Sequence, residues 1–370
     1  MTEPIHTDLP QLRVGKHTAR LPIIQGGMGI RISGARLAGA VAKEGAVGVI
    51  ASVALGIKSS YYKKKKDYFE ANKLALRDEI AMARKTAPDG VIGVNCMVAI
   101  TDYEAMSRTA AENGANLIIS GAGLPLQLPS FTKDFPDCAL VPIVSTAKAA
   151  QVLCRRWEGT HGRLPDAFVV ENPNTAGGHL GASREQLGDP VYNLEKVIPE
   201  IIEYLDSEGY DIPVLAAGGV WDRTDIDRMF EHGASGVQMA TRFVCTHECD
   251  ADDVFKLQFL KRKPSDVVIV DSPAGLPGRA IGTELVQRIQ DGGKVAMQCF
   301  ANCLKKCLCR DDKTTFCIAY ALDKAVRGNL EEGLFFTGSN LARSESIVSV
   351  RELLEELCEA LTPAQAPALV

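Results

Sequence analysis

One histidine stands where its side chain could do chemistry, in a glycine-rich loop after a short apolar run. The run 168–170 (Phe-Val-Val) predicts a buried strand, and His179 follows it with Gly177, Gly178 and Gly181 around it. Glycine has no Cβ and lets a ligand approach the backbone closely, and an imidazole titrates near neutral pH. The pattern indicates either a catalytic histidine or an ordinary loop histidine, and the surrounding chain favours the first.

Five of the 11 cysteines form a second group of reactive side chains: Cys299, Cys303, Cys307, Cys309 and Cys317. Their four-residue steps would place three of them on one side of a helix. Four thiolates, from Cys299, Cys303, Cys307 and Cys317, suit a [4Fe–4S] cluster. A zinc site and free buried thiols are the alternatives, and Cys309 competes with Cys307 for one ligand position.

The bulk composition is that of an ordinary globular protein. The net charge of −5 argues against a nucleic-acid partner. No apolar run reaches the roughly 18 residues that a membrane helix needs, so no membrane is expected. The polar N-terminus lacks a secretory-signal pattern, which predicts a cytoplasmic location. Because the cytosol keeps thiols reduced, the cysteines are not expected to form a disulfide framework.

Short apolar runs alternate with helical segments from residue 21 to residue 241. Strands are expected at 21–25, 46–51, 91–96, 117–120, 140–145, 167–170, 213–216 and 236–239. Strands that are apolar on both faces indicate a parallel sheet covered by helices, and eight such units predict a (β/α)8 TIM barrel. A doubly wound open sheet is the alternative. Residues 1–20 are expected to form a short strand pair that closes the bottom of the fold.

The alternation of strands and helices ends after residue 241. We therefore predict that residues 1–241 form the barrel. Residues 242–370 would form a C-terminal extension that carries the cysteine cluster and closing helices at 318–327 and 348–360. The predicted fold class is α/β, a TIM barrel with a cysteine-rich helical appendage.

Two loops have the composition of a phosphate site. The loops after strands seven and eight of such barrels often bind phosphate through backbone N–H groups. Gly218 and Gly219 follow the seventh run, and Gln238, Met239 and Thr241 lie at the end of the eighth. Either loop alone could be a simple tight turn, but the two together at these places predict an anion site.

The ends of the first and third runs could lie against a flat ring. The first run ends in Gln25-Gly-Gly-Met-Gly29, where Gly27 and Met28 leave the backbone open to a ligand. Asn95 ends the third run, and its amide can both donate and accept, as the edge of a flavin ring requires. A polar cap of the strand end is the alternative role for Asn95.

Three motifs resemble those of the nitronate monooxygenase family, formerly called 2-nitropropane dioxygenases, and of the related FMN-dependent enoyl-ACP reductases. They are Ile24-Gln-Gly-Gly-Met28, Ala176-Gly-Gly-His-Leu-Gly181, and Ala216-Ala-Gly-Gly219 followed by Gln238-Met-Ala-Thr-Arg242. The similarity runs from about residue 21 to residue 241 and again through 272–279.

The resemblance implies a TIM barrel that binds FMN non-covalently. His179 would be the catalytic residue near the reactive face of the flavin, as the base for an acidic carbon or as an orienting donor. The residues implied to bind FMN are Gly27, Met28, Asn95, Gly178, Gly218, Gly219, Gln238, Met239 and Thr241.

The resemblance also implies an FMN-dependent oxidoreductase that oxidises a nitronate or a similar acidic-carbon substrate. The alternative is a reductase of an activated alkene, such as an enoyl thioester, that uses FMN and an iron–sulfur cluster. Two departures bear on the substrate. The monooxygenases often have Ala-Pro where this chain has Gly26 and Gly27, so this motif resembles that of the reductases more closely. Residues 171–175, which precede the histidine motif, differ from the Gly- and Glu-containing segment that is more usual there. A non-enzymatic redox sensor is a third hypothesis.

A small molecule is the expected substrate, and NAD(P)H or an electron-transfer protein is the expected further partner. No separate G-x-G-x-x-G unit is visible in the sequence. NAD(P)H would therefore have to bind at the flavin face. The oligomeric state stays open, with a homo-oligomer as one candidate.

Overall fold

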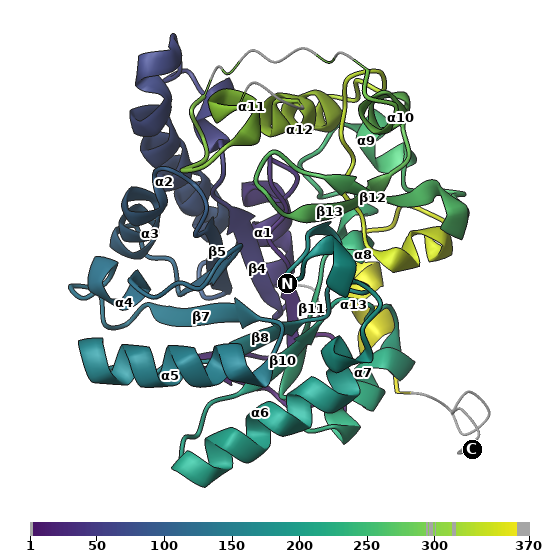
Figure 1. The fold of residues 1–370 in the computed structure, drawn as a ribbon. Helices are drawn as coiled ribbons and strands as arrows, with labels where there is room; N and C mark the ends of the chain where they lie inside the picture. The colour runs from purple at the N-terminus through teal and green to yellow at the C-terminus, as the bar shows by residue number, and fades with distance from the viewer. Residues whose placement is uncertain (1–2, 294, 296–298, 300, 313–315, 361–370) are drawn as a thin grey trace.

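Eight parallel strands close into a barrel in the computed structural model, which describes residues 3–293, 295, 299, 301–312 and 316–360 (Figure 1). Around the barrel the strand order is β10-β11-β3-β4-β5-β6-β7-β8. The strands are β3 (Ile23–Gln25), β4 (Val47–Ala51), β5 (Val91–Met97), β6 (Leu117–Gly121), β7 (Ala139–Val144), β8 (Phe168–Glu171), β10 (Val214–Ala217) and β11 (Gly236–Met239). The predicted TIM barrel is confirmed, and each strand lies within two residues of its predicted bounds.

The barrel interior is filled by small and branched apolar side chains from alternate positions of the strands. Ile24, Val49, Ile119 and Val169 belong to one buried cluster inside the barrel. A hairpin of β1 (Leu12–Val14) and β2 (His17–Ala19) adds Leu12 and Val14 to the same cluster. The N-terminal strand pair therefore covers the end of the barrel where the strands begin, as predicted, and leaves the other end for ligands.

An outer ring of helices covers the barrel strands (Figure 1). The helices are α1 (Ala35–Lys43), α2 (Tyr68–Thr86), α3 (Tyr103–Glu112), α4 (Leu128–Phe131), α5 (Ala147–His161), α6 (Leu194–Glu208), α7 (Arg223–Glu231) and α8 (Thr241–Val244). Their apolar faces pack on the outward-facing side chains of the strands, as in Trp157 of α5 and Phe168 of β8, both fully buried. No helix among the described residues is both long and apolar enough to cross a membrane.

After α8 the chain covers the end of the barrel where the strands finish, and its last helix packs against α1, α7 and α8 of the outer ring (Figure 1). Its elements are α9 (Asp253–Leu257), β12 (Val267–Asp271), β13 (Pro277–Ile281), α10 (Glu284–Gln290), α11 (Leu308–Asp311), α12 (Ile318–Val326) and α13 (Val350–Cys358). β12 and β13 form a three-stranded antiparallel sheet with β9 (Gly178–His179). The prediction of a helical appendage missed this sheet, which joins the extension to the loop that carries the histidine.

Candidate active site

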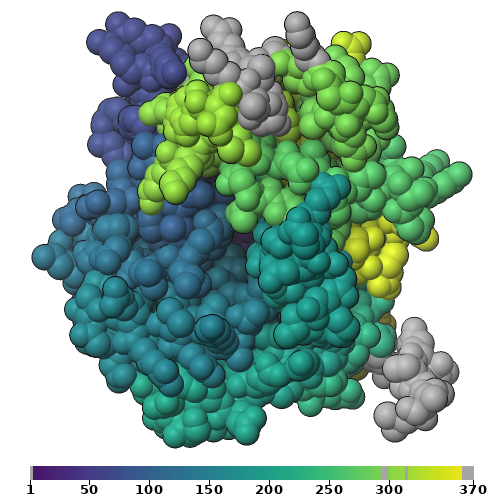
Figure 2. Space-filling model, in the orientation of Figure 1, coloured from purple at the N-terminus to yellow at the C-terminus, as the bar shows by residue number. Residues whose placement is uncertain are grey.

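The C-terminal ends of the barrel strands surround a cavity of about 260 Å³. Its floor is formed by strand ends and the residues just after them, among them Gly27, Asn95, Glu171, Ala217 and Gln238. Its walls and roof come from the loop 175–179, Cys303 and Leu304, α12, and the segment 336–340. Figure 2 shows the surface hollowed where the green extension meets the blue and teal barrel. The cavity is therefore built jointly by the barrel and the extension.

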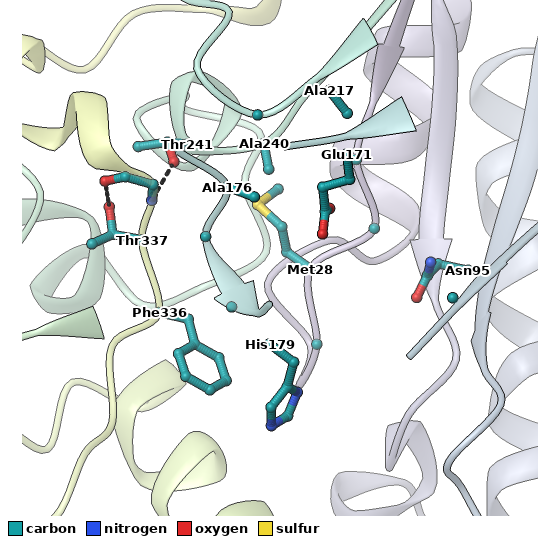
Figure 3. Close-up of a pocket in the computed structure, with 18 of the residues that line it drawn as sticks. Met28, Asn95, Glu171, Ala176, His179, Ala217, Ala240, Thr241, Phe336 and Thr337 are labelled. Carbon is teal, nitrogen blue, oxygen red and sulfur yellow. Dashed lines mark hydrogen bonds between the residues drawn. The ribbon is translucent and has the colours of Figure 1, made fainter. Parts of the chain in front are cut away.

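His179 lies in this cavity, held at the end of the short strand β9. Its neighbour Leu180 donates a backbone hydrogen bond to Pro277 O at 2.9 Å, and His179 itself stands opposite Gly278 of β13. The ring Nε2 is 2.7 Å from Ser272 Oγ, and the Phe336 ring contacts the imidazole edge to face at 5.1 Å between centroids (Figure 3). Nδ1 makes no hydrogen bond within the described part of the chain, so it is the nitrogen available to a ligand.

The surroundings of His179 keep its imidazole neutral. Burial lowers the pKa of His179 to about 4, because a charged ring would lose its hydration in the cavity. At neutral pH the ring can therefore accept a proton or donate one hydrogen bond, but it carries no charge. Ser272 and Phe336 were not predicted as site residues. Ser272 begins the stretch 272–279 that shares the family resemblance, but nothing in the sequence places it beside His179, and Phe336 lies outside every motif.

Two glycines shape one end of the cavity, where the seventh barrel strand ends. Gly218 and Gly219 have φ values of +85° and +86°, which residues with a side chain rarely adopt. Asn340 Nδ2 donates to Gly219 O at 2.7 Å, and the Thr241 hydroxyl accepts from Gly338 N at 3.1 Å (Figure 3). The predicted phosphate loops thus lie side by side, and the segment 338–340 of the extension covers them.

Two amide side chains also line the cavity, that of Gln238 on β11, beside Ala217 of β10, and that of Asn95 on β5. Gln238 Oε1 is buried and has no hydrogen-bond partner among the described residues. Asn95 donates from Nδ2 to Ile119 O at 3.4 Å, which leaves its Oδ1 toward the cavity. Gly27 passes so close to Asn95 that a Cβ on Gly27 would lie 2.3 Å from Asn95 Cβ. Buried polar atoms are normally paired, so the Gln238 oxygen is suited to accept a hydrogen bond from a ligand in the cavity.

The structure brings the predicted ligand-binding residues together around one cavity. The lining includes Gly27, Met28, Asn95, Gly178, His179, Gly218, Gly219, Gln238, Met239 and Thr241. It also includes Cys303, which the sequence assigned to a separate metal site. Their individual roles in binding a cofactor stay predictions.

The cysteine segment forms part of the cavity roof, and it is not a continuous helix. Leu304 forms an isolated bridge with Ile100, and Thr101 N donates to Cys303 O at 2.9 Å. The chain is therefore extended at Cys303 and becomes helical only after Cys307, the residue before α11. The prediction of one helix carrying Cys299, Cys303 and Cys307 is wrong, because pairing with residues 98–101 holds the backbone extended.

The thiols of this segment lie near one another and form no disulfide. Burial, together with the nearby Cys317, Cys307 and Cys299, raises the pKa of Cys303 to about 12. Cys309 is within hydrogen-bond reach of Cys317. Among the described residues, however, no three His, Cys, Asp or Glu side chains are arranged to hold one metal ion.

Glu171, the last residue of β8, places a carboxyl group in the same cavity (Figure 3). Burial raises its pKa to about 7, and the positive charge of Arg279 on β13 opposes this shift only in part. Sequence reasoning missed Glu171 as a site residue. The signal that could have found it is an acidic residue placed directly after the apolar run 168–170.

Comparisons with known proteins agree with this geometry. The family model described as nitronate monooxygenase matches residues 11–360. A 5-hydroxy-7a-methyl-1-oxo-octahydro-1H-indene-4-carboxyl-CoA dehydrogenase of Mycobacterium tuberculosis is 26% identical over 276 residues, which are 74% of this chain and 66% of that relative. A probable nitronate monooxygenase of Bacillus subtilis is 24% identical over 242 residues, or 62% of each protein. The chain spans less than two thirds of the length of these relatives.

The solved structure of FabK from Thermotoga maritima has the same fold. The two chains superpose with a TM-score of 0.68 over 92% of each chain, at 24% sequence identity. At this identity the likeness concerns the fold.

Proposed function

Because this chain belongs to the nitronate monooxygenase family of FMN-dependent oxidoreductases, we propose that it binds FMN in the cavity around His179 and oxidises a nitronate or a similar acidic-carbon substrate there. The observation that carries the proposal is the unpaired, buried Oε1 of Gln238 at the cavity edge. An oxidised flavin ring has one N–H group that needs such an acceptor. The bend at Gly218 and Gly219, covered by 338–340, is suited to the phosphate of FMN.

Bound FMN would supply the two-electron acceptor, and the side chains of this chain would position the substrate and handle its proton. From a neutral acidic-carbon substrate, His179 would take the carbon-bound proton at Nδ1. A nitronate has already lost that proton, and His179 would donate to one of its oxygens from the same atom. Ser272 would hold the ring through Nε2 at 2.7 Å. Phe336, Met28 and Leu322 line the cavity and would keep water from the reacting carbon.

Replacing Gln238 with leucine should weaken FMN binding by about tenfold, because the flavin N–H would lose its acceptor in a buried site. Fluorescence titration of apoprotein with FMN measures the dissociation constant. Gln287→Leu, on the exposed face of α10, is the matched control and should bind like the wild type. Equal FMN affinity in all three proteins would contradict the role of Gln238.

Reduction of an activated alkene is the second candidate function. It is favoured by the roof of the cavity, where the thiol-bearing segment at Cys303 contributes directly to the lining. The Mycobacterium tuberculosis relative is named as a dehydrogenase of a carboxyl-CoA compound, which is a thioester. Mixing the oxidised holoprotein with NADPH or with ethyl nitronate, without oxygen, separates the candidates. Rapid bleaching of the flavin by NADPH alone supports the reductase. Bleaching by the nitronate alone supports the oxidation of a nitronate.

We further propose that Cys299, Cys303, Cys307 and Cys317 hold a [4Fe–4S] cluster at this roof. The support is their crowding in sequence and the mutual electrostatic effect of their thiols. As placed here, the thiols do not converge on one ion. Each cysteine of such a cluster binds a different iron, so convergence on one ion is not required. Residues 300 and 313–315 lie outside the described part of the chain.

Protein purified without oxygen should therefore contain about four irons and as much acid-labile sulfide per chain. Cys303→Ser and Cys317→Ser should each remove most of the iron, because a cluster with three thiolates is labile. Cys358→Ser, in α13 away from the roof, should keep it. Flavin-loaded wild-type protein without iron would overturn the cluster.

A further inference from the structure

Glu171 is a second titratable group in the cavity, and neither function proposed above uses it. It ends β8, where it stands opposite Ala217 of β10, and its side chain extends into the cavity with those of Met28 and Asn95 (Figure 3). No donor among the described residues hydrogen-bonds to its carboxyl group. A carboxyl group that lines a cavity without a hydrogen-bond donor either lowers the stability of the fold or takes part in the reaction.

Arg279 is the cation nearest to Glu171, but its hydrogen bonds go elsewhere. Its guanidinium donates to Pro173 O at 3.1 Å, to Asn174 O at 3.0 Å, and to Ala176 O. Glu171 therefore receives a favourable charge interaction from Arg279 without being fixed in a bidentate ion pair. The carboxyl group stays free to exchange a proton with a ligand.

The other charged or titratable neighbours do not compete for this role. His179 on β9 is neutral, since burial lowers its pKa to about 4. Arg242 on α8 is paired with Glu356 on α13 at 2.6 Å, and Cys303 is assigned to the cluster proposed above. A general acid works best when its pKa is near the working pH. Burial raises the pKa of Glu171 to about 7 and lowers the pKa of His179 to about 4. The two environments therefore shift the two pKa values in opposite directions.

We propose that Glu171 is a further general acid–base residue of this cavity, exchanging its carboxyl proton with the flavin when the flavin changes redox state. The proposal rests on the binding of FMN proposed above. When a hydride donor or the acidic-carbon substrate delivers two electrons, Glu171 gives up its O–H proton and an N–H bond forms on the ring. The electron pair of the broken bond stays on the carboxylate, beside Arg279. When O2 or an activated alkene reoxidises the flavin, the acceptor takes the two electrons, the ring N–H proton returns to Glu171, and water supplies the proton that the reduced acceptor needs.

The test replaces Glu171 with glutamine, which keeps the size of the side chain and cannot ionise. The reduction potential of bound FMN in the wild type should show an inflection near pH 7 that is absent in Glu171→Gln, and turnover should fall by about 10²-fold. FMN affinity should stay within about threefold of the wild type, since the carboxyl group is not needed to hold the ring. Glu158→Gln, exposed on α5, should behave as the wild type in each measurement.

An inflection that persists unchanged in Glu171→Gln would overturn the proposal. Should that variant fail to fold, infrared spectra of the wild-type holoprotein decide instead. The carboxylic acid C=O band of a buried acid should disappear as the pH rises through about 7, and its absence below that pH would also overturn the proposal. Wild-type protein that binds no FMN would instead refute the proposed function, so the two failures are distinguishable.

Discussion

Replacing His179 with alanine should lower kcat/KM by about 10²–10⁴-fold and leave FMN bound. The imidazole offers the free nitrogen Nδ1 to the cavity, while its other nitrogen is held by Ser272. Strand β9 pairs with β13 through backbone atoms, so loss of the side chain leaves the loop in place. Steady-state kinetics gives the loss, and the absorbance of the purified variant gives the flavin content.

His161→Ala is the matched control for this substitution. His161 lies at the end of α5 and contacts Leu126 O at 3.1 Å, outside the residues that line the cavity. It should retain wild-type turnover. If His179→Ala turned over as fast as His161→Ala, with flavin bound in both, His179 would have no catalytic role.

Replacing Arg279 with methionine should cost about 3–5 kcal/mol of the free energy of unfolding and most of the turnover. The buried guanidinium joins β13 to three carbonyl groups of the loop 173–176, and each of these acceptors would lose a charge-assisted hydrogen bond. The loop leads directly to His179, so the histidine would lose its fixed position. Urea unfolding and kcat measured on the same protein check both effects.

Loss of Arg279 should also raise the pKa of Glu171 further, because the charge that opposes the effect of burial would be removed. Arg184→Met is the matched control: Arg184 pairs with Asp271 on the protein surface, where an ion pair contributes about 0–1 kcal/mol. Equal unfolding midpoints for the two variants would show that Arg279 does not hold the loop.

The barrel could be predicted from the sequence because each of its strands is a short apolar run bounded by turn residues. Strands such as β4 and β10 are buried along their whole length and contain no charged residue, so their pattern is unambiguous. The residues around the cavity could be predicted where glycines and amides follow these strands. Parallel strands bring their ends to one side of the barrel, so Asn95 and Gln238 line the same cavity although far apart in the chain.

The sheet of the extension and the residues it contributes could not be predicted. β12 carries only partly buried residues for most of its length, and β9 has two residues, too few for any periodicity. Ser272, Arg279 and Phe336 reach the site only through this sheet. The cysteine segment was misassigned for a related reason, since a spacing of four favours a helix but the contact with Ile100 holds Leu304 extended.

The pairing of β9 with β13 sets the order in which the enzyme becomes competent during synthesis. A nascent chain folds from its N-terminus as it leaves the ribosome, so the barrel strands are available before residue 277 has been made. His179 acquires its strand partner only when 277–281 emerge, and the cavity is covered only after residue 340. Cofactor loading is therefore a late event. A message truncated after the barrel would yield a protein with all eight strands and no anchored histidine.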